Sequence, residues 1–235
     1  MHNDKVHVRF GERPCETTSR ETGRRAWSTP PKLKGPATWT CFHLFVIIDI
    51  FSRYVVGWML ATRESAELAE QLISDTVLKH DIAPGTLTLH ADRGSSMRSK
   101  PVAALLIDLD VAKTHSRPHV SDDNPYSEAQ FKTLKYRPEF PDRFGYIEDA
   151  RAHCRRFFQW YNHVHRHSGI ALMTPETVHF GTAAALTQQR SVTLDAAFAA
   201  HPNRFKGRHL SRQNCPPPCG SIRRRSSLPL PPSAL

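Results

Sequence analysis

A run of apolar residues around position 45 constrains the fold of this chain more than any other feature. Phe42–Ile50 is almost continuously apolar and rich in Val and Ile, which is typical of a buried strand. Phe51–Arg53 makes a short turn, and Tyr54–Leu60 predicts a second strand. We therefore expect an antiparallel hairpin in the interior of a sheet.

Helix and strand patterns alternate after this hairpin. Apolar residues at helical spacing predict a helix over residues 64–79, and an alternating run predicts a strand over residues 86–90. The other expected elements are, in chain order, a helix at 101–109, a strand at 111–115 and helices at 125–136, 147–165, 175–180 and 192–200. This order predicts an α/β fold, a mixed sheet flanked by helices, with Asp92 at the carboxyl end of a strand, where such sheets place their ligands.

The net charge comes mainly from the C-terminal end. The 235 residues include 32 Lys and Arg against 22 Asp and Glu, a formal charge of +10. Such an excess favours a polyanion, most plausibly nucleic acid, as the partner. Residues 204–235, however, contain seven of the basic residues and no acid, so residues 1–203 carry only +3. A solvated basic tail therefore explains most of the excess.

Several classes of protein are excluded. No apolar run approaches the roughly 20 residues of a membrane helix, because the run that starts at Leu44 is cut at Asp49. The N-terminus has no apolar signal segment. Five cysteines are an odd number and are scattered, which favours reduced thiols over a disulfide framework. We therefore expect a cytoplasmic protein without a membrane partner.

Composition divides the chain into four parts. Residues 1–26 are polar, lack helix or strand periodicity, and are expected to be disordered. Residues 27–184 hold the predicted sheet and its helices, and residues 185–205 are expected to form a helical extension. Residues 206–235 are rich in Pro, Ser and Arg, and a segment of this composition cannot pack a core.

Two carboxylates are the best candidates for chemistry. Asp92 follows a predicted strand, and Glu128 lies in the first turn of the helix that begins at Pro125 after the N-cap Asn124. Two-metal phosphoryl transfer needs carboxylates from separate elements around ions about 3.5–4 Å apart, and Mg²⁺ suits such a site because it binds one or two carboxylates and keeps waters. Alternatively, Glu128 is a first-turn acid favoured by the helix dipole and Asp92 is a turn residue.

Two lysines share a helix face with Glu128. Lys132 and Lys135 follow it by four and seven residues, so two helical turns bring all three onto one stripe. A carboxylate with two lysines on one stripe could hold a metal at its tip and a DNA backbone alongside.

These motifs together resemble the integrase core of bacterial insertion-sequence transposases, the branch related to retroviral integrases. Asp92 and Glu128 are separated by 35 residues, the spacing that this family uses, and Lys135 matches its basic residue seven after the glutamate. The segments that carry the resemblance are Phe45–Trp58, His90–Ser95, Asn124–Lys135, Trp160–Asn162, Arg166–His167 and Thr174–Glu176.

The resemblance implies a ribonuclease-H-like catalytic core at 27–184 and Mg²⁺-dependent (or Mn²⁺-dependent) DNA cleavage followed by strand transfer in transposition. Asp92 and Glu128 would be catalytic metal ligands, and Lys132, Lys135 and Arg93 would contact DNA. The implied partners are transposon-end and target DNA, and a helix-turn-helix subunit or an intact transposase. Residues 1–235 contain no helix-turn-helix pattern before the core, so we expect end-specific binding to come from another polypeptide or from a missing upstream segment. We expect a homo-oligomer on DNA, associated with the nucleoid of a bacterium.

The sequence departs from the family at the first strand, which carries a third carboxylate in Trp-Ser-Trp-Asp-Ile-Thr-Lys-Leu. Here Trp27–Leu33 reads Trp-Ser-Thr-Pro-Pro-Lys-Leu, one residue shorter and without an acid. Prolines in a central strand also remove ladder hydrogen bonds. Asp49 is the nearest downstream acid, but it matches a non-catalytic hairpin aspartate of the family. We therefore expect a catalytically inactive transposase core or, alternatively, a non-catalytic remnant that binds DNA or pairs with an intact subunit.

Three histidines near the end of the predicted helix at 147–165 are weaker candidates. Of His163, His165 and His167, only the first and last are four residues apart and could share a metal. The alternative, which we favour, is solvated histidines near a helix C-terminus.

The tail resembles a frameshift product. Residues 215–224 read Cys-Pro-Pro-Pro-Cys-Gly-Ser-Ile-Arg-Arg, close to what GC-rich codons for a common transposase C-terminus give when read one nucleotide later. Our hypothesis is that the charge of residues 206–235 was not selected for DNA binding.

Truncation after Phe205 tests this hypothesis. The basic tail should give non-specific binding to DNA that weakens steeply with salt, because each phosphate contact releases counterions. The truncated chain should show a flatter salt dependence in fluorescence anisotropy and an unchanged melting curve. Loss of cooperative unfolding on truncation would instead show that the tail is packed against the core.

Overall fold

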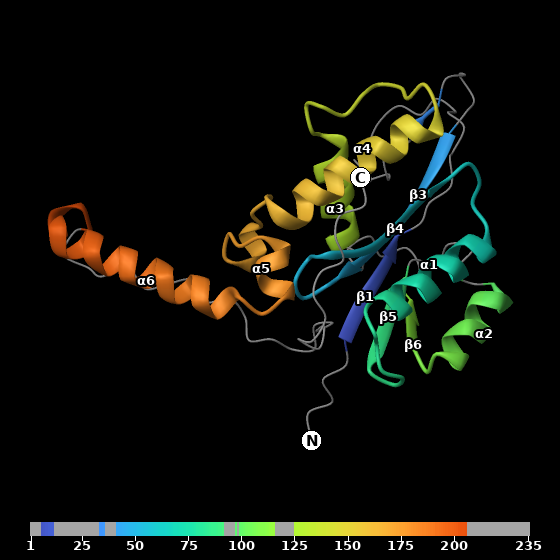
Figure 1. Ribbon diagram of the computed structural model, residues 1–235, viewed down its shortest axis with the longest axis horizontal. Helices are drawn as coiled ribbons and strands as arrows, with labels where there is room; N and C mark the ends of the chain where they lie inside the picture. Colours follow the sequence, from blue (N-terminus) through green and yellow to red (C-terminus); the bar gives the residue numbers. More distant parts are fainter. Residues whose placement is uncertain are drawn as a thin grey trace, which may run out of the picture.

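Six strands of the described chain form one mixed sheet (Figure 1). The computed structural model describes residues 6–11, 33–35, 41–91, 97, 99–115 and 125–205, with the backbone alone for 6–11 and 115. The strands are β1 (Val6–Gly11), β2 (Leu33–Lys34), β3 (Cys41–Asp49), β4 (Val55–Ala61), β5 (Leu87–Ala91) and β6 (Ala112–His115). The order across the sheet is β4-β3-β1-β5-β6, with β2 on the β1 side of β3. Strands β1, β5 and β6 run parallel, and β3 is antiparallel to its neighbours.

Strand β1 corrects the prediction that residues 1–26 are disordered. Val6–Gly11 lies at the centre of the sheet, antiparallel to β3 and parallel to β5. Apolar Val6, Val8 and Phe10 alternate with His7 and Arg9, and this period of two is the signal of a strand. The polar residues on both sides of so short a run obscure the signal. The rest of residues 1–26 lies outside the described part of the chain.

The prolines at 30 and 31 disfavour a strand that continues backwards from β2. Strand β2 pairs Leu33 with Phe42 and Lys34 with Cys41. If this register continued backwards along β3, Pro30 and Pro31 would face Phe45 and Leu44. Successive residues of a strand turn their N–H groups to opposite neighbours, so two adjacent prolines would remove a donor from each side of the strand.

Helices cover both faces of the sheet (Figure 1). On one face, α1 (Ala66–Lys79) and α2 (Lys100–Asp108) pack on Phe45 and Ile47 of β3 and on Leu87 and Leu89 of β5. On the other face, α3 (Pro125–Lys135) and α4 (Ile147–His163) pack on Leu44, Val46 and Ile48. The α/β class and the predicted order of elements from Phe42 to His179 are therefore confirmed.

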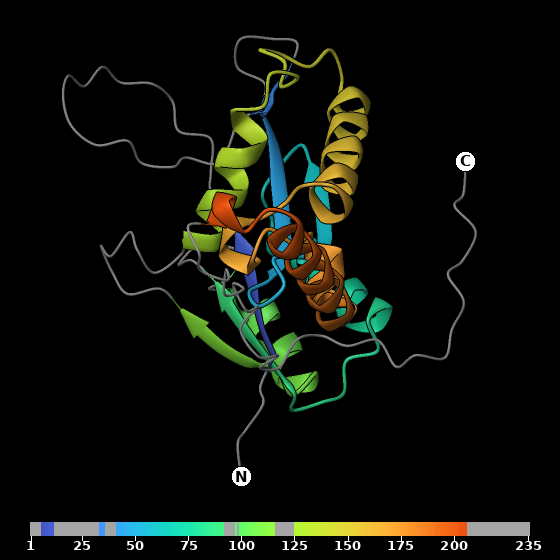
Figure 2. The same cartoon turned by 90° about the vertical axis from the view of Figure 1, so that its left-hand side faces the viewer.

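The C-terminal helices differ from the prediction in length. Helix α5 (Pro175–His179) begins after the N-cap Thr174, whose hydroxyl accepts a hydrogen bond from the Thr177 N–H. Helix α6 (Ala183–Ala200) begins nine residues before the predicted helix at 192–200, so the predicted boundary between 184 and 185 falls inside it. Figure 1 shows α6 projecting from the body of the protein, and Figure 2 shows the same helix from its projecting side, in front of the rest of the chain. No helix in the described ranges is long and apolar enough to span a membrane.

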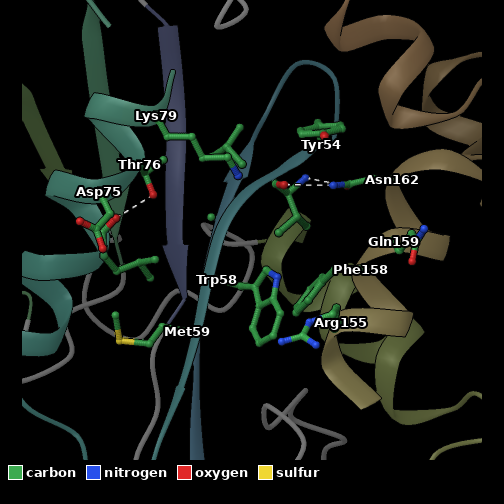
Figure 3. Close-up of a pocket in the computed structure, with 14 residues that line it drawn as sticks. Tyr54, Trp58, Met59, Asp75, Thr76, Lys79, Arg155, Phe158, Gln159 and Asn162 are labelled. Atoms are coloured by element: carbon green, nitrogen blue, oxygen red, sulfur yellow. Dashed lines mark hydrogen bonds between the residues drawn. The ribbon is translucent and has the colours of Figure 1, made fainter. Parts of the chain in front are cut away.

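Strands β4 and β6 are the edge strands of the described sheet, and a groove of about 340 Å³ runs along the outer edge of β4 between α1 and α4 (Figure 3). Asn162 on α4 covers the start of this edge. Its amide oxygen accepts from the Val55 N–H at 2.9 Å, and its NH₂ donates to the Val55 C=O at 3.0 Å. The side chain thus replaces a neighbouring strand at one residue, with both partners buried.

Replacing Asn162 with Ala should therefore destabilise the fold. The change leaves a buried N–H and a buried C=O without partners, at a cost of about 2–4 kcal/mol in the free energy of unfolding. Gln159→Ala, one turn earlier on the exposed side of α4, is the matched control and should cost less than about 0.5 kcal/mol. Urea unfolding of both variants measures the difference. Equal effects of the two substitutions would contradict a role for Asn162 in closing the edge.

Candidate functional site

The first predicted site residue follows the end of β5. Strand β5 ends at Ala91, and Phe10 of β1 lies opposite Ala91 in the parallel pairing. Asp92 and Arg93 come next in the chain and lie outside the described residues. The carboxyl end of β5 is thus beside the end of β1, where parallel strands of a sheet place ligands.

Helix α3 carries the other predicted residues on one stripe. Its buried face consists of Ser127, Gln130, Phe131 and Leu134. Glu128 is half-buried, and Lys132 and Lys135 are exposed. The Glu128 carboxylate makes no hydrogen bond or ion pair with another residue of the described ranges. Strand β1 contacts both α3, which carries Glu128, and β5, which Asp92 follows in the sequence.

Strand β1, at the centre of the sheet, has no carboxylate residue near the end of β5. Its sequence is Val-His-Val-Arg-Phe-Gly, without an acid. Its last residue, Gly11, lies opposite Val46 of β3 and follows the residue paired with Ala91. The β1 position nearest the end of β5 therefore has no side chain that could bind a metal.

Asp49 is fully buried in the turn of the β3–β4 hairpin. Its carboxylate accepts hydrogen bonds from the Ser52 hydroxyl at 2.5 Å and from the Phe51 N–H at 3.1 Å. The His179 Nδ1 lies 3.2 Å from the same carboxylate, and the Tyr54 ring stacks on His179 with centroids 4.4 Å apart. These contacts explain the hairpin aspartate as a structural residue that joins α5 to the turn.

Arg53 ties the same turn to helix α3. Its backbone is left-handed, with φ of 65°, and its N–H donates to the Asp49 C=O at 2.8 Å. Its guanidinium stacks over the Tyr126 ring at 3.6 Å from the centroid. Tyr126 precedes Glu128 by two residues, so this cation–π contact fixes the first turn of α3 against the hairpin. No sequence pattern signals a contact between residues so far apart.

The three histidines do not form a metal site. The His163 Nδ1 lies 3.0 Å from a Glu176 carboxylate oxygen, whereas His165 and His167 pack against the Tyr161 ring. Burial, with smaller effects of His165 and Arg53, lowers the pKa of His167 to about 4. The prediction of solvated histidines is therefore wrong for His167. Over the described part of the chain, no three His, Cys, Asp or Glu residues gather as metal ligands.

The donors available near α3 are of the kind that hard cations prefer. Glu128 presents carboxylate oxygens that other described residues leave free, and Asp92 is a carboxylate next to β5 in the sequence. Mg²⁺ and Mn²⁺ bind such oxygen donors, and no soft or imidazole ligand is required. The groove along β4 contains none of the predicted site residues.

The sequence matches the integrase core domain family over residues 25–121 and again over residues 109–175. The two matches together run from residue 25 to residue 175 and include Asp92 and Glu128. They agree with the predicted mixed sheet flanked by helices, which the structure confirms.

Insertion-sequence transposases are among the proteins similar to this chain. The transposase for insertion sequence element IS904 of Lactococcus lactis is 29% identical over 135 residues, which are 57% of this chain and 53% of the relative. Transposase InsF for insertion sequence IS3A of Escherichia coli K12 is 29% identical over 135 residues, 57% of this chain and 46% of the relative. The chain thus spans about half the length of these relatives. The solved catalytic core domain of BIV integrase aligns with a TM-score of 0.47 and 16% identity, covering 74% of this chain and 93% of that chain.

The lowered pKa of His167 predicts acid sensitivity. Between about pH 6.5 and pH 4 the unfolded chain binds a proton at this residue and the folded chain does not, so stability falls as the pH falls. With allowance for partial exposure, we expect a loss of about 1–2 kcal/mol between pH 7 and pH 4.5.

His167→Phe keeps the ring and removes the proton site, so this variant should lose less stability over the same pH range. His163→Phe changes an exposed histidine and should leave the loss as large as in the parent chain. Urea unfolding at both pH values measures these differences. An undiminished loss in the His167→Phe variant would show that other groups cause the acid sensitivity.

Proposed function

The chain belongs to the integrase core domain family of insertion-sequence transposases, and we propose that it binds transposon DNA through this core without cutting it. The family activity that the residues imply is metal-dependent cleavage of DNA followed by strand transfer. In this chain Asp92 and Glu128 are retained, but the first carboxylate is missing. The chain is thus a transposase core that has lost its catalysis.

The retained carboxylates would hold the metal. Glu128 stands on a helix that the Arg53–Tyr126 contact and a buried apolar face fix in place. In a core with all three carboxylates, Mg²⁺ or Mn²⁺ would supply activation of the attacking oxygen and stabilisation of the leaving oxygen of the phosphodiester. Glu128 and Asp92 supply oxygen ligands, and Lys132 and Lys135 lie on the exposed stripe beside Glu128, where they would pair with DNA phosphates. Arg93 would add a third phosphate contact next to Asp92.

The observation that carries the proposed loss of catalysis is the central strand. The strand beside the end of β5 is Val6–Gly11, which has no acid, and residues 27–33 have none either. Asp49 is held by three donors inside the hairpin turn. Two carboxylates remain where the chemistry needs three, and removing one member of a concerted set costs roughly 10³-fold or more in rate.

DNA binding without cleavage is the activity that these residues still support. The exposed lysines of α3 are independent of the missing aspartate, so affinity for DNA should survive its loss. Recognition of transposon ends would come from a helix-turn-helix subunit or from an intact transposase in a mixed oligomer. In that oligomer the chain would act in the bacterial cytoplasm as a DNA-binding, subunit-pairing component.

Restoring the aspartate tests this function. The parent chain should show no nicking of transposon-end DNA above background in Mn²⁺, even with a helix-turn-helix partner. Replacing Thr29-Pro30-Pro31 with Trp-Asp-Ile-Thr restores the acid, the length and the backbone donors. The repaired chain should cleave at least about 10³-fold faster than the parent, and Glu128→Gln in the repaired chain should abolish cleavage again. Both chains should bind the DNA with similar affinity.

Other acids provide the controls. Glu12 follows β1 in the sequence, and Asp49 lies in the hairpin. Cleavage by the parent chain that Glu12→Gln or Asp49→Asn removes, with melting unchanged, would show that another acid has replaced the lost one. A repaired, folded chain that binds DNA but stays inactive would contradict the assignment of the missing residue.

A further inference from the structure

Two arginines beside helix α3 stack on aromatic rings, and they differ in their acid partners. The Arg137 guanidinium lies 3.8 Å from the centroid of the Trp160 ring and donates to both carboxylate oxygens of Glu139, at 2.9 and 3.1 Å. The Arg53 guanidinium lies 3.6 Å from the centroid of the Tyr126 ring. It makes no hydrogen bond or ion pair with any residue of the described ranges, so its charge has no counterion among them.

Arg53 is only partly exposed to solvent, so the missing partner has a cost. Its Nη1 nitrogen is buried and finds no hydrogen-bond acceptor among the described residues. A charge that is partly removed from water loses hydration, and this loss is offset only when an opposite charge or an acceptor is close. The surroundings of Arg53 therefore favour an anion as a ligand.

His167 lies within the influence of the same charge. Its ring meets the Tyr161 ring edge-on, with centroids 4.8 Å apart, and the His165 ring, with centroids 4.4 Å apart. Its Nε2 nitrogen is buried and has no hydrogen-bond partner in the described ranges. Burial is the main cause of its lowered pKa, and the charges of His165 and Arg53 lower the pKa further. In the Arg53 cluster (Arg53, Tyr126, His165 and His167), the charged groups that act on His167 are thus cations.

The Arg53 cluster contacts helix α3, through Tyr126, on the flank opposite to Glu128. Tyr126 and Glu128 precede and follow the buried Ser127 by one residue each. Each therefore lies about 100° around the helix from Ser127, in opposite directions. DNA that lies along the exposed face of α3 would meet the lysines of the Glu128 stripe on one side and Arg53 on the other.

We propose that Arg53 and His167 form a subsite for one backbone phosphate of DNA, across helix α3 from Glu128. The guanidinium, held on the Tyr126 ring, is oriented in advance and can donate two hydrogen bonds to a phosphate. The imidazole adds a donor when it binds a proton, and a bound phosphate favours that protonated form. A phosphate contact carries no sequence information, so the subsite would fix the position of DNA on the core. This inference rests on the proposed function, because it names a further DNA contact of the same core.

Arg53→Gln tests the subsite by removing the charge. Both residues carry a Cβ, so the left-handed backbone at position 53, with φ of 65°, is strained alike in the two chains. The variant should bind duplex DNA roughly tenfold more weakly, and the slope of log affinity against log salt should become shallower by about 1. Fluorescence anisotropy measures both quantities, and two duplexes of unrelated sequence should show the same loss.

Arg63→Gln is the matched control. Arg63 is exposed and follows the far end of β4, whereas Arg53 precedes its start. The control removes the same charge and should weaken binding less than about twofold, because salt screens a distant exposed charge. Equal losses in the two variants would show that net charge alone matters and would overturn the subsite. If Arg53→Gln loses cooperative melting, histidine NMR on the parent chain decides instead.

Histidine NMR tests the subsite without a substitution. His167 faces the rings of Tyr161 and His165 and the charge of Arg53, and none of these groups is negative at neutral pH. Bound DNA should therefore raise the pKa of His167, and raise it more than the pKa of His163, an exposed histidine at the end of α4. An unchanged pKa of His167 at saturating DNA, or an equal rise at both histidines, would overturn the proposal.

Inorganic phosphate separates this subsite from the proposed function. A saturable shift of the His167 signals by inorganic phosphate, lost in Arg53→Gln, together with no binding of DNA, would support the subsite and contradict the proposed function. DNA binding that is equal in the parent chain and in Arg53→Gln, but weaker in Lys132→Gln and Lys135→Gln, would support the proposed function and overturn the subsite.

Discussion

The hydrogen-bonding demand of two buried strand edges governs this structure. Strands β3 and β5 face each other across one strand width, and each presents a row of N–H and C=O groups in the interior. Each unpaired group there would cost about 1–3 kcal/mol, so the gap has to be filled by some extended segment. Both helical layers depend on this filling, because α1 and α2 rest on one face of β3 and β5 while α3 and α4 rest on the other face of β3. These edges require backbone donors and acceptors rather than particular side chains. Val6–Gly11 can therefore fill the gap although its sequence differs from that of the family's first strand.

A second set of contacts holds helix α3 to the β3–β4 hairpin. The hairpin turn bonds to α5 through Asp49 and His179, and it contacts α3 through Arg53 and Tyr126. These contacts use residues of the hairpin and of the C-terminal half alone. The position of Glu128 is therefore set by the buried face of α3 and by the hairpin contact, in addition to the packing of α3 over β1.

Much of the fold could be predicted because its signals are local. The apolar run of β3, the helical spacing of α1 and α4 and the capped start of α3 each lie within about twenty residues of sequence. Strand β1 was missed because its alternation is short and lies among polar residues. The early start of α6 was missed because its Ala-rich first half carries no apolar stripe along one face.

The candidate site, too, was predictable from the sequence only in part. The stripe of Glu128, Lys132 and Lys135 follows from helix periodicity and is found as predicted, since all three lie on one α3 surface. The absence of an acid at positions 29–31 is also visible in the sequence. Which segment lies between β3 and β5 depends on pairing between strands that are far apart in the chain, and no local sequence pattern specifies this pairing. The burial of Asp49 likewise depends on His179, 130 residues away.

The Asp49–His179 contact has a consequence for how such a gene decays. Because the hairpin binds α5 through its own buried carboxylate, this contact uses no residue of the first strand. Mutations can remove the chemistry while the product stays folded enough to escape proteolysis. Under the proposed function, such a product would compete as a folded protein for the DNA sites of its active relatives, and selection against it would act through binding rather than through misfolding.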